Sequence, residues 1–223
     1  MLDLEEIRVI AGSEEIKDKR GKGMNFVRKK GNLIIISGPS GVGKGTVCRA
    51  LLANCQDITL SISATTRKAR INEREGREYF FYTKQDFLNS IGENAFLEWA
   101  QVFGNYYGTP RTYVESILEQ GKDCILEIDV QGAMQVKSIW PTGIFIFLVP
   151  PSREELVRRI SNRGTESETE IQKRLNRAEE EMAHLKSYEY VVLNDLIEDA
   201  AQKIRAIIVA ERCRTSRVDL TFK

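Results

Sequence analysis

A glycine-rich segment with one lysine is the clearest candidate for chemistry in this sequence. It follows a short apolar run, precedes a helix-like pattern and reads Gly38, Pro39, Ser40, Gly41, Val42, Gly43, Lys44, Gly45 and Thr46. Glycines let backbone N–H groups turn inward around a phosphate, and the N-terminus of a following helix favours negative charge. Lys44 can reach the β- and γ-phosphates and stabilise charge on a phosphoryl group in transfer. The segment therefore predicts a binding loop for a nucleoside triphosphate.

The position after the lysine departs from the usual pattern of such loops. A serine or threonine normally stands there and approaches Mg²⁺, whereas this chain has Gly45 and then Thr46. Thr46 is therefore our candidate hydroxyl for the metal. Glu127 and Asp129 end a later apolar run, and a carboxylate at either position can orient Mg²⁺ or its waters. The sequence does not decide between those two carboxylates.

Several further motifs follow the loop in a fixed order. They are Ser63-Ala64-Thr65-Thr66-Arg67-Lys68-Ala69-Arg70, Phe96-Leu97-Glu98-Trp99-Ala100, Gly104-Asn105-Tyr106-Tyr107-Gly108-Thr109, Ile125-Leu126-Glu127-Ile128-Asp129-Val130-Gln131-Gly132, Arg163-Gly164-Thr165-Glu166 and Lys173-Arg174-Leu175. Together with the loop they resemble the guanylate kinases over about residues 31–210. The resemblance implies an enzyme that uses Mg²⁺ and moves the γ-phosphate of ATP onto GMP, giving ADP and GDP. We expect dGMP to fit as well, unless another contact reads the ribose.

The resemblance assigns an acceptor site to residues whose chemistry suits GMP. Four residues match the family's phosphate clamp, and guanidinium forks and phenol hydroxyls are good phosphate donors; they are Arg67, Arg70, Tyr79 and Tyr107. Glu98 matches the family residue that binds guanine, because a carboxylate can accept hydrogen bonds from the adjacent N1–H and N2–H₂ groups. Ser63 and Thr109 match hydroxyl residues that contact the base, and the resemblance also places Asp129 near guanine. Ala69 replaces the family's usual proline before the second arginine of the clamp.

Three arginines are candidates for a lid over the transferred phosphate. Arg159 and Arg163 lie four residues apart on a helix that begins after Ser152, and Arg174 lies just inside the next helix. Mobile cations of this kind supply positive charge and help to exclude water during phosphoryl transfer. The alternative is an ordinary charged helix surface. Asn194 matches a family asparagine near adenine, but an asparagine after a strand is also a common turn former.

The elements that must position these residues follow from apolar patterns. Short apolar runs at 33–36, 124–128, 144–148 and 191–193 indicate strands covered on both faces, and helix-like patterns lie between them. Strands that alternate with helices predict an α/β fold with a parallel sheet flanked by helices. From 66 to about 107 the pattern changes to short aromatic segments broken by glycines, which indicates a β-rich insertion.

We therefore expect an N-terminal extension and one enzyme-sized unit. Residues 1–30 mix charges and glycines and are typical of a partly disordered extension. Residues 31–223 form the P-loop domain. Its expected parts are a core (31–62, 112–152 and 185–223), a GMP-binding insertion (about 63–111) and a helical lid (about 153–184).

The composition gives no sign of a nucleic-acid or membrane partner. The 223 residues include 33 Lys+Arg and 32 Asp+Glu, so the net charge is only +1. No apolar run approaches the roughly 18 residues of a membrane span. Four scattered cysteines without a close pair favour a reducing, cytoplasmic location, and the single histidine, His184, excludes a histidine cluster.

Two other functions are compatible with parts of this pattern. Guanylate-kinase-like domains also serve as inactive modules that bind phosphorylated partners, and such modules typically lose the phosphate loop or the lid arginines. A related kinase of another phosphorylated acceptor is the second alternative. This chain keeps Lys44 with its glycines, and Glu98 with Ser63 and Thr109 favours guanine. Both features favour a GMP kinase.

Overall fold

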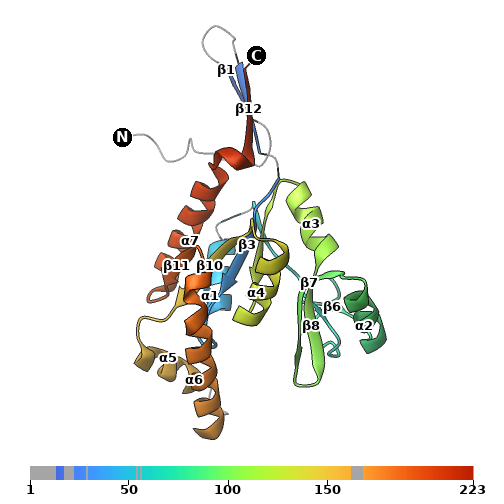
Figure 1. The fold of residues 1–223 in the computed structure, drawn as a ribbon, viewed down its shortest axis with the longest axis vertical. Coiled ribbons are helices and arrows are strands. Elements are labelled where there is room, and N and C mark those ends of the chain that lie inside the picture. Colours follow the sequence, from blue (N-terminus) through green and yellow to red (C-terminus); the bar gives the residue numbers. More distant parts are fainter. Residues whose placement is uncertain are drawn as a thin grey trace.

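A five-stranded parallel sheet forms the centre of the computed structural model, which describes residues 14–17, 23–28, 30–53, 55, 57–161 and 168–222. The strand order is β11-β10-β3-β9-β4 (Figure 1). The strands are β3 (Leu33–Ser37), β4 (Ile58–Leu60), β9 (Asp123–Glu127), β10 (Ile144–Val149) and β11 (Tyr190–Leu193). The four predicted apolar runs are confirmed as parallel strands, and the α/β fold class is confirmed with them.

Helices cover both faces of this sheet, which explains why its strands are apolar throughout. In β3, Ile34 and Ile36 face one helical layer while Leu33 and Ile35 face the other, and all four side chains are at most 3% exposed. The first layer consists of α1 (Lys44–Ala53) and α7 (Ile197–Arg212), and the second of α3 (Arg111–Glu119) and α4 (Val130–Ile139). Because burial of each such side chain contributes about 1.5–3 kcal/mol, this sandwich is a firm base for the loops at its edge.

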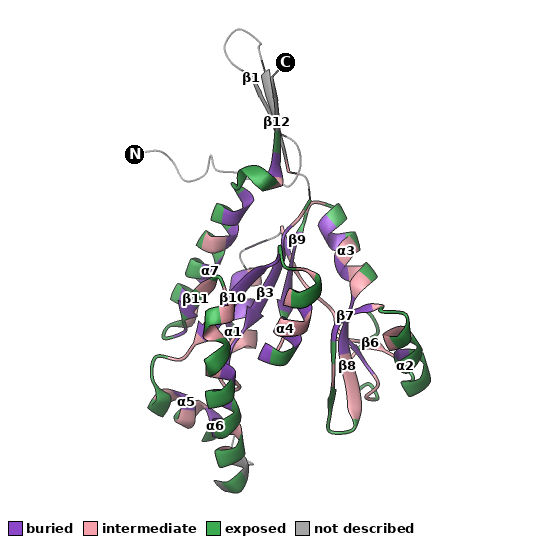
Figure 2. Ribbon diagram, in the orientation of Figure 1, coloured by how far each residue is buried: buried purple, intermediate pink, exposed green. Residues whose placement is uncertain are grey.

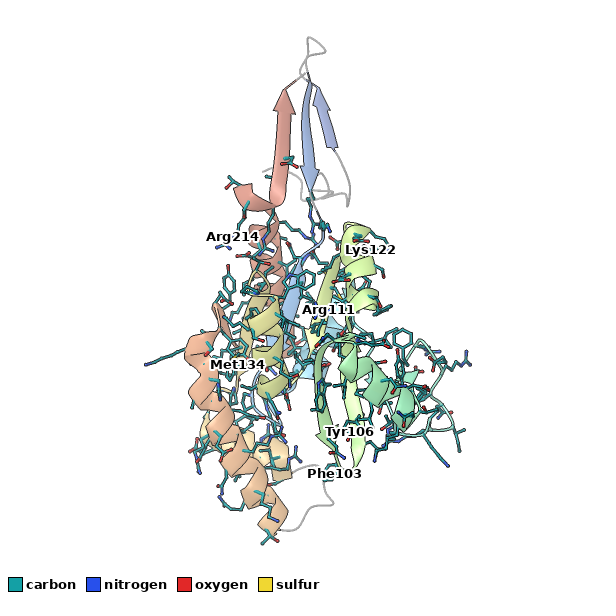
Figure 3. The ribbon with its side chains drawn as sticks, turned by 45° about the vertical axis from the view of Figure 1, so that its right-hand side comes forward. Phe103, Tyr106, Arg111, Lys122, Met134 and Arg214 are labelled. Atoms are coloured by element: carbon teal, nitrogen blue, oxygen red, sulfur yellow. The ribbon has the colours of Figure 1, made fainter. Side chains whose placement is uncertain are left out.

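The predicted insertion forms a separate four-stranded sheet with one helix. Its strand order is β6-β5-β8-β7, and its parts are β5 (Ala64–Thr65), β6 (Phe80–Phe81), α2 (Lys84–Gly92), β7 (Phe96–Val102) and β8 (Asn105–Pro110). Phe87 and Phe96 stack with ring centres 4.4 Å apart, so the aromatic pattern in the sequence marks this lobe's own small core. Tyr106 lies along the β7–β8 hairpin, and Phe103 lies at its exposed tip (Figure 3).

The predicted lid consists of α5 (Arg153–Ser161) and α6 (Glu168–Met182), followed by a 3₁₀ turn, Ala183–Ser187. The Ser152 hydroxyl accepts a hydrogen bond from the Glu155 N–H at 3.1 Å and so caps the helix that the sequence predicted to begin after Ser152. The two helices pack on each other through Leu156, Ile160 and Leu175, while their outer faces are exposed (Figure 2). Arg163 lies outside the described residues. None of the helices described is long and apolar enough to cross a membrane.

A third sheet is built from both ends of the chain. The strands β1 (Glu14–Lys17), β2 (Gly23–Arg28) and β12 (Val218–Phe222) are antiparallel in the order β1-β2-β12, and this sheet projects from the core at the end opposite the lid (Figure 1). Two strands therefore lie within the predicted extension 1–30. The disorder expected for that segment, and its boundary at residue 30, stay predictions.

A buried cluster of charges joins this sheet to the core. Asp123, at the start of β9, is fully buried and accepts hydrogen bonds from the side chains of Arg28 and Arg212 and from the Asn32 N–H. Arg212 also pairs with Asp57. Because the strands are parallel, this cluster lies at the amino edge of the central sheet, and the phosphate loop lies at the carboxyl edge.

Candidate active site

The glycine-rich loop joins the end of β3 to the start of α1. Gly38, Gly41 and Gly43 have φ angles of 146°, 87° and 96°, which side chains rarely allow. A Cβ at Gly38 would lie 2.3 Å from the carbonyl oxygen of Leu148 in β10. Glycine there lets the chain turn close beside the neighbouring strand. The first turn of α1 carries no acidic residue, so its positive end is available to a phosphate.

Lys44 lies against the carbonyl groups of its own loop. Its Nζ donates to the carbonyl oxygens of Gly38 at 2.7 Å and Pro39 at 3.4 Å. Burial lowers the pKa of Lys44, and the nearby Glu181, Glu127 and Asp129 carboxylates act in the opposite direction. The amine therefore already lies among the loop's phosphate-binding groups.

Two residues singled out in the sequence bind the same carbonyl group in the middle of the loop. The carbonyl oxygen of Val42 accepts hydrogen bonds from Asn194 Nδ2 at 2.7 Å and from Arg159 Nη1 at 3.2 Å. Arg159 also donates to the Asn194 carbonyl at 3.1 Å and pairs with Glu155. Asn194 is 2% exposed, and its Oδ1 has no partner within the described ranges. The structure thus places Asn194 under the loop, and its contact with adenine stays a prediction.

The second lid helix also reaches the loop. Arg174 Nη2 donates to the Ser40 hydroxyl at 3.2 Å, and the Ser40 N–H donates to Glu181 Oε2 at 2.8 Å. Arg159 and Arg174, which come from different helices, therefore both contact the same loop, and their role over a transferred phosphate stays a prediction. The structure gives no position for Arg163.

The carboxylate of Glu127 lies beside the glycine that follows the lysine. An ideal Cβ at Gly45 would lie 3.1 Å from Glu127 Oε1, so a side chain there would press on the carboxylate. Thr46 is exposed, and its hydroxyl accepts a hydrogen bond from Arg49 at 3.3 Å. In the described part of the chain, no group of three or more His, Cys, Asp or Glu residues could hold a metal ion alone.

Glu98 lies inside the insertion and faces the core. It pairs in register with Thr109 on the next strand, and the Thr109 hydroxyl donates to Glu98 Oε1 at 2.6 Å. Burial raises the pKa of Glu98 to about 7; the Thr109 hydrogen bond lowers it, and the nearby Asp129 charge raises it. A Cβ atom built on Gly132 would lie 3.0 Å from Glu98 Oε2 and 3.4 Å from Asp129 Oδ1, so the two carboxylates are near neighbours. Two carboxylates, one from each lobe, therefore meet at the start of α4.

Three of the four residues predicted to bind the GMP phosphate lie close together: Arg67, Tyr79 and Tyr107. The Arg67 guanidinium lies 5.4 Å from the centre of the Tyr79 ring, and the Tyr79 and Tyr107 rings lie 6.2 Å apart, edge to face. Glu73 accepts two hydrogen bonds from Arg67, at 2.8 and 3.0 Å, and one from the Arg70 N–H at 2.9 Å. These bonds lower the pKa of Glu73, with the Arg67 contact the largest cause. A carboxylate is bound here by groups that suit a phosphate.

The strand register places Ser63 near Glu98 and Thr109. Ala64 pairs with Gly108 in the antiparallel β5–β8 ladder, so Ser63 comes opposite Thr109. The Ser63 carbonyl accepts the Phe80 N–H at 2.9 Å. The structure therefore brings Ser63, Glu98 and Thr109 into one region of the insertion.

Three charged residues of this region were not predicted from the sequence: Glu73, Arg177 and Glu181. Glu73 follows Arg70 by three residues, a spacing that can close a turn. Arg177 and Glu181 follow Arg174 by three and seven residues, which places all three on one helix face. This helical spacing is the sequence signal that could have identified Arg177 and Glu181.

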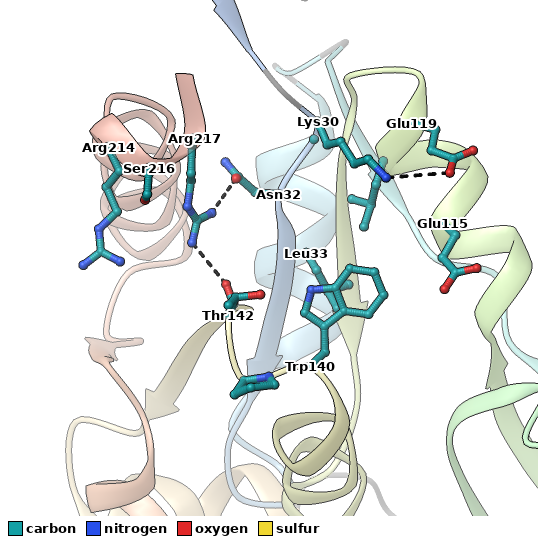
Figure 4. Close-up of a pocket in the computed structure, with 13 residues that line it drawn as sticks. Lys30, Asn32, Leu33, Glu115, Glu119, Trp140, Thr142, Arg214, Ser216 and Arg217 are labelled. Carbon is teal, nitrogen blue, oxygen red and sulfur yellow. Dashed lines mark hydrogen bonds and ion pairs between the residues drawn. The ribbon is translucent and has the colours of Figure 1, made fainter. Parts of the chain in front are cut away.

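A cavity of about 830 Å³ lies away from these residues. Lys30, Asn32, Trp140 and Arg217 line it at the amino edge of the sheet, where Arg217 binds Asn32 and the Thr142 carbonyl (Figure 4). None of the predicted site residues lines it. We therefore assign the site by its chemistry rather than by cavity size.

Comparisons with known proteins agree with this geometry. The guanylate kinase family model matches residues 30–211. The chain is 55% identical to a guanylate kinase of Caldanaerobacter subterraneus subsp. tengcongensis over 86% of its own length and 93% of the relative's. It is 52% identical to a guanylate kinase of Syntrophomonas wolfei over 87% and 100%. A crystal structure of guanylate kinase from Anaplasma phagocytophilum superposes with a TM-score of 0.68 at 36% identity, covering 86% of this chain and 91% of that one.

Proposed function

The chain belongs to the guanylate kinase family, and we propose that it transfers the γ-phosphoryl group of ATP to GMP, releasing ADP and GDP. This reaction serves the synthesis and recycling of guanine nucleotides. The observation that carries the choice of acceptor is the buried Glu98 carboxylate, held by Thr109 and close to Asp129. The chain therefore has both a carboxylate suited to bind guanine and a loop suited to bind the phosphates of ATP.

Guanine recognition is proposed for Glu98, Ser63, Thr109 and Asp129. An ionised Glu98 accepts hydrogen bonds from guanine N1–H and N2–H₂, and Thr109 keeps the carboxylate oriented. Adenine lacks this pair of donors and would leave the buried carboxylate unpaired, at a cost of roughly 1–3 kcal/mol. GMP should therefore be preferred over AMP. We expect dGMP to be used as well, because no residue is assigned to the ribose 2′-hydroxyl.

Binding of the GMP phosphate is proposed for Arg67, Arg70, Tyr79 and Tyr107. The support is the Glu73 carboxylate, which already accepts two parallel hydrogen bonds from Arg67, as a phosphate could. GMP would compete with Glu73 for Arg67, and the exposed Arg70 side chain could add a second fork. This arrangement fixes the attacking phosphate oxygen.

The transfer itself is proposed as direct in-line attack of a GMP phosphate oxygen on the γ-phosphorus of ATP. The bond between the γ-phosphorus and the bridging oxygen to ADP breaks as the new bond forms. Lys44, Arg159, Arg163 and Arg174 would stabilise the charge, and the loop residues Gly38 to Thr46 would hold the phosphates. Arg159 and Arg174 already contact this loop, which supports their role. Asn194 is proposed to support the loop and border the adenine.

Mg²⁺ is the proposed cofactor, bound together with ATP, and it would neutralise charge on the β- and γ-phosphates. Glu127 fits a water-mediated contact because its carboxylate lies directly beside Gly45 of the loop. Asp129 fits less well, since its two oxygens already accept hydrogen bonds from Gly132 and Arg177. Thr46 stays a second candidate. We further propose a cytoplasmic location, because four free cysteines suit a reducing compartment.

Release of ADP from Mg·ATP, followed with GMP, AMP, CMP and UMP in turn, tests this function. We expect turnover with GMP, a loss of about 100-fold or more in kcat for Lys44→Ala, and poor use of GMP by Glu98→Ala. Lys68→Ala, an exposed neighbour of the clamp, is the matched control and should keep its activity. A folded protein that binds nucleotide but is silent with all four acceptors would instead indicate an inactive binding module or another phosphorylated acceptor.

A further inference from the structure

One face of α6 carries a row of charged side chains towards the phosphate loop. Arg174, Arg177 and Glu181 follow one another at spacings of three and four residues, so they share this face. Arg174 is already assigned to the lid. Arg177 and Glu181 belong to none of the roles described above.

Hydrogen bonds connect these two residues to both nucleotide sites. The Ser40 N–H of the loop donates to Glu181 Oε2 at 2.8 Å, and Arg177 Nε donates to Glu181 Oε1 at 3.2 Å. Arg177 Nη2 then donates to Asp129 Oδ2 at 2.9 Å. A continuous path therefore runs from the ATP loop, along α6, to the carboxylate beside the guanine-reading Glu98.

Glu181 is placed where it can fix the shape of the loop. Only 8% of the residue is exposed, and it lies on the last turn of α6, close to the point where the lid joins the core. Loss of its carboxylate would leave the Ser40 N–H without this acceptor. The peptide group of Ser40 could then rotate, and the N–H would point in another direction. A loop that must present several N–H groups to phosphates is sensitive to such a change.

The charge of Glu181 requires a partner in this place. An uncompensated carboxylate beside the loop would repel the phosphates of ATP. Lys44 lies nearby, and Arg177 supplies a second positive charge through its direct contact with Glu181, although 56% of the Arg177 side chain is exposed. The pair therefore gives the loop a hydrogen-bond acceptor with little net charge.

We propose that Glu181 and Arg177 are positioning residues for phosphoryl transfer. Glu181 fixes the direction of the Ser40 N–H in the ATP loop. Arg177, which also binds Asp129, orients the Glu181 carboxylate and balances its charge. The inference rests on the proposed function. An ordinary ion pair on a helix surface would change stability slightly and leave substrate kinetics alone. The two interpretations therefore differ in what they predict for ATP.

Steady-state kinetics with ATP and GMP, on variants whose folding is checked by thermal unfolding, test this inference. We expect Glu181→Ala to raise the KM for ATP about tenfold, and Glu181→Gln, which keeps an acceptor oxygen, to raise it by less than about threefold. Arg177→Met should raise it about fivefold, because it removes the cation in direct contact with this carboxylate. Glu180→Ala, an exposed neighbour on the same helix, is the matched control and should match the wild type.

The double variant Arg177→Met with Glu181→Gln gives the sharpest outcome. Removal of the carboxylate's charge should rescue Arg177→Met to within about twofold of Glu181→Gln alone, a coupling that independent sites do not show. Additive losses in the double variant would overturn the inference, as would an unchanged KM for ATP in Glu181→Ala. Wild-type turnover with GMP tests the proposed function separately, so the two failures are distinguishable.

Discussion

The chemistry of single residues in this site is governed by burial. Glu98 is 8% exposed, and its raised pKa follows mainly from loss of solvent around the charged carboxylate. Such a group binds guanine donors strongly when ionised, but it ionises less readily than a surface glutamate. Affinity for the base and proton uptake are therefore linked at this residue.

The KM for GMP should depend on pH through Glu98. With a pKa of about 7 in the free protein, the carboxylate becomes protonated as pH falls through neutrality and loses acceptor capacity towards guanine. We expect the KM for GMP to rise about tenfold for each pH unit well below that pKa. Glu98→Gln should have a higher KM with a shallower pH dependence, set mainly by the second pKa of the GMP phosphate, about 6. An equally steep profile in Glu98→Gln would assign the titration to another group.

The raised pKa of Glu98 should also make the stability of the free protein depend on pH. The folded pKa of about 7 lies above the ordinary value of 4.5, so the fold favours protonated Glu98. That contribution is complete below pH 4.5 and is lost as pH rises through about 7. Urea unfolding should find Glu98→Gln more stable than wild type by roughly 3 kcal/mol at pH 8, with a smaller difference at pH 5. A difference that does not change with pH would contradict the assigned pKa.

At the scale of elements, the phosphate loop is shaped by its neighbours as much as by its own sequence. Its glycines at 38, 41 and 43 lie within 3 Å, measured from an ideal Cβ, of Leu148, Ile160 and Asn194, which come from three different parts of the chain. Each glycine thus combines an unusual φ with a close approach. The loop can be tight because β10, α5 and the end of β11 pack directly around it.

Two glycine substitutions separate backbone strain from close approach. Gly38→Ala would place Cβ against the Leu148 carbonyl, whereas Gly121→Ala meets nothing within 4 Å, although both glycines have positive φ. We expect Gly121→Ala to lose about 1–2 kcal/mol of unfolding free energy from strain alone. Gly38→Ala should lose more than about 3 kcal/mol, because a backbone atom must also move. Equal losses in urea unfolding would mean that the contact with β10 is relaxed at little cost.

At the scale of the whole molecule, catalysis and anchoring lie at opposite edges of one sheet. The carboxyl edge carries the phosphate loop, Glu127 and Asp129. The amino edge carries buried Asp123 with Arg28 and Arg212, which join β2 and α7 to the core. A buried ion pair gives little net stability, but a charge left without its partner there is costly.

Asp123→Asn should therefore destabilise the protein without changing its chemistry. The substitution leaves two buried arginines short of negative charge, and we expect a loss of about 3–5 kcal/mol in urea unfolding. The kcat of the folded fraction and the KM for both substrates should stay near wild type, because the residue lies at the far edge of the sheet. Asp57→Asn, on the more exposed partner of Arg212, is the control and should cost less. A raised KM for either substrate would show that the two edges are coupled.

The sequence by itself determined the features that depend on local order. A run of apolar residues, a glycine-rich turn and a helix pattern define the strand, loop and helix around Lys44. Short apolar runs also indicate β3 and β10, and Ser152 marks the start of α5. The aromatic change after Thr66 likewise marked the insertion. Such signals are local because strands, turns and helix caps are set by residues a few positions apart.

Only the tertiary structure decided which distant groups meet. Asn194 supports Val42 from 152 positions away, and Glu181 reaches Ser40 across 141. Gly45 lies beside Glu127, 82 positions further along the chain, and the pKa of Glu98 depends on a burial that no spacing in the chain reveals. These contacts arise from the packing of whole layers and lobes. The sequence therefore predicted the parts of the site, and the fold decided the partners that tune them.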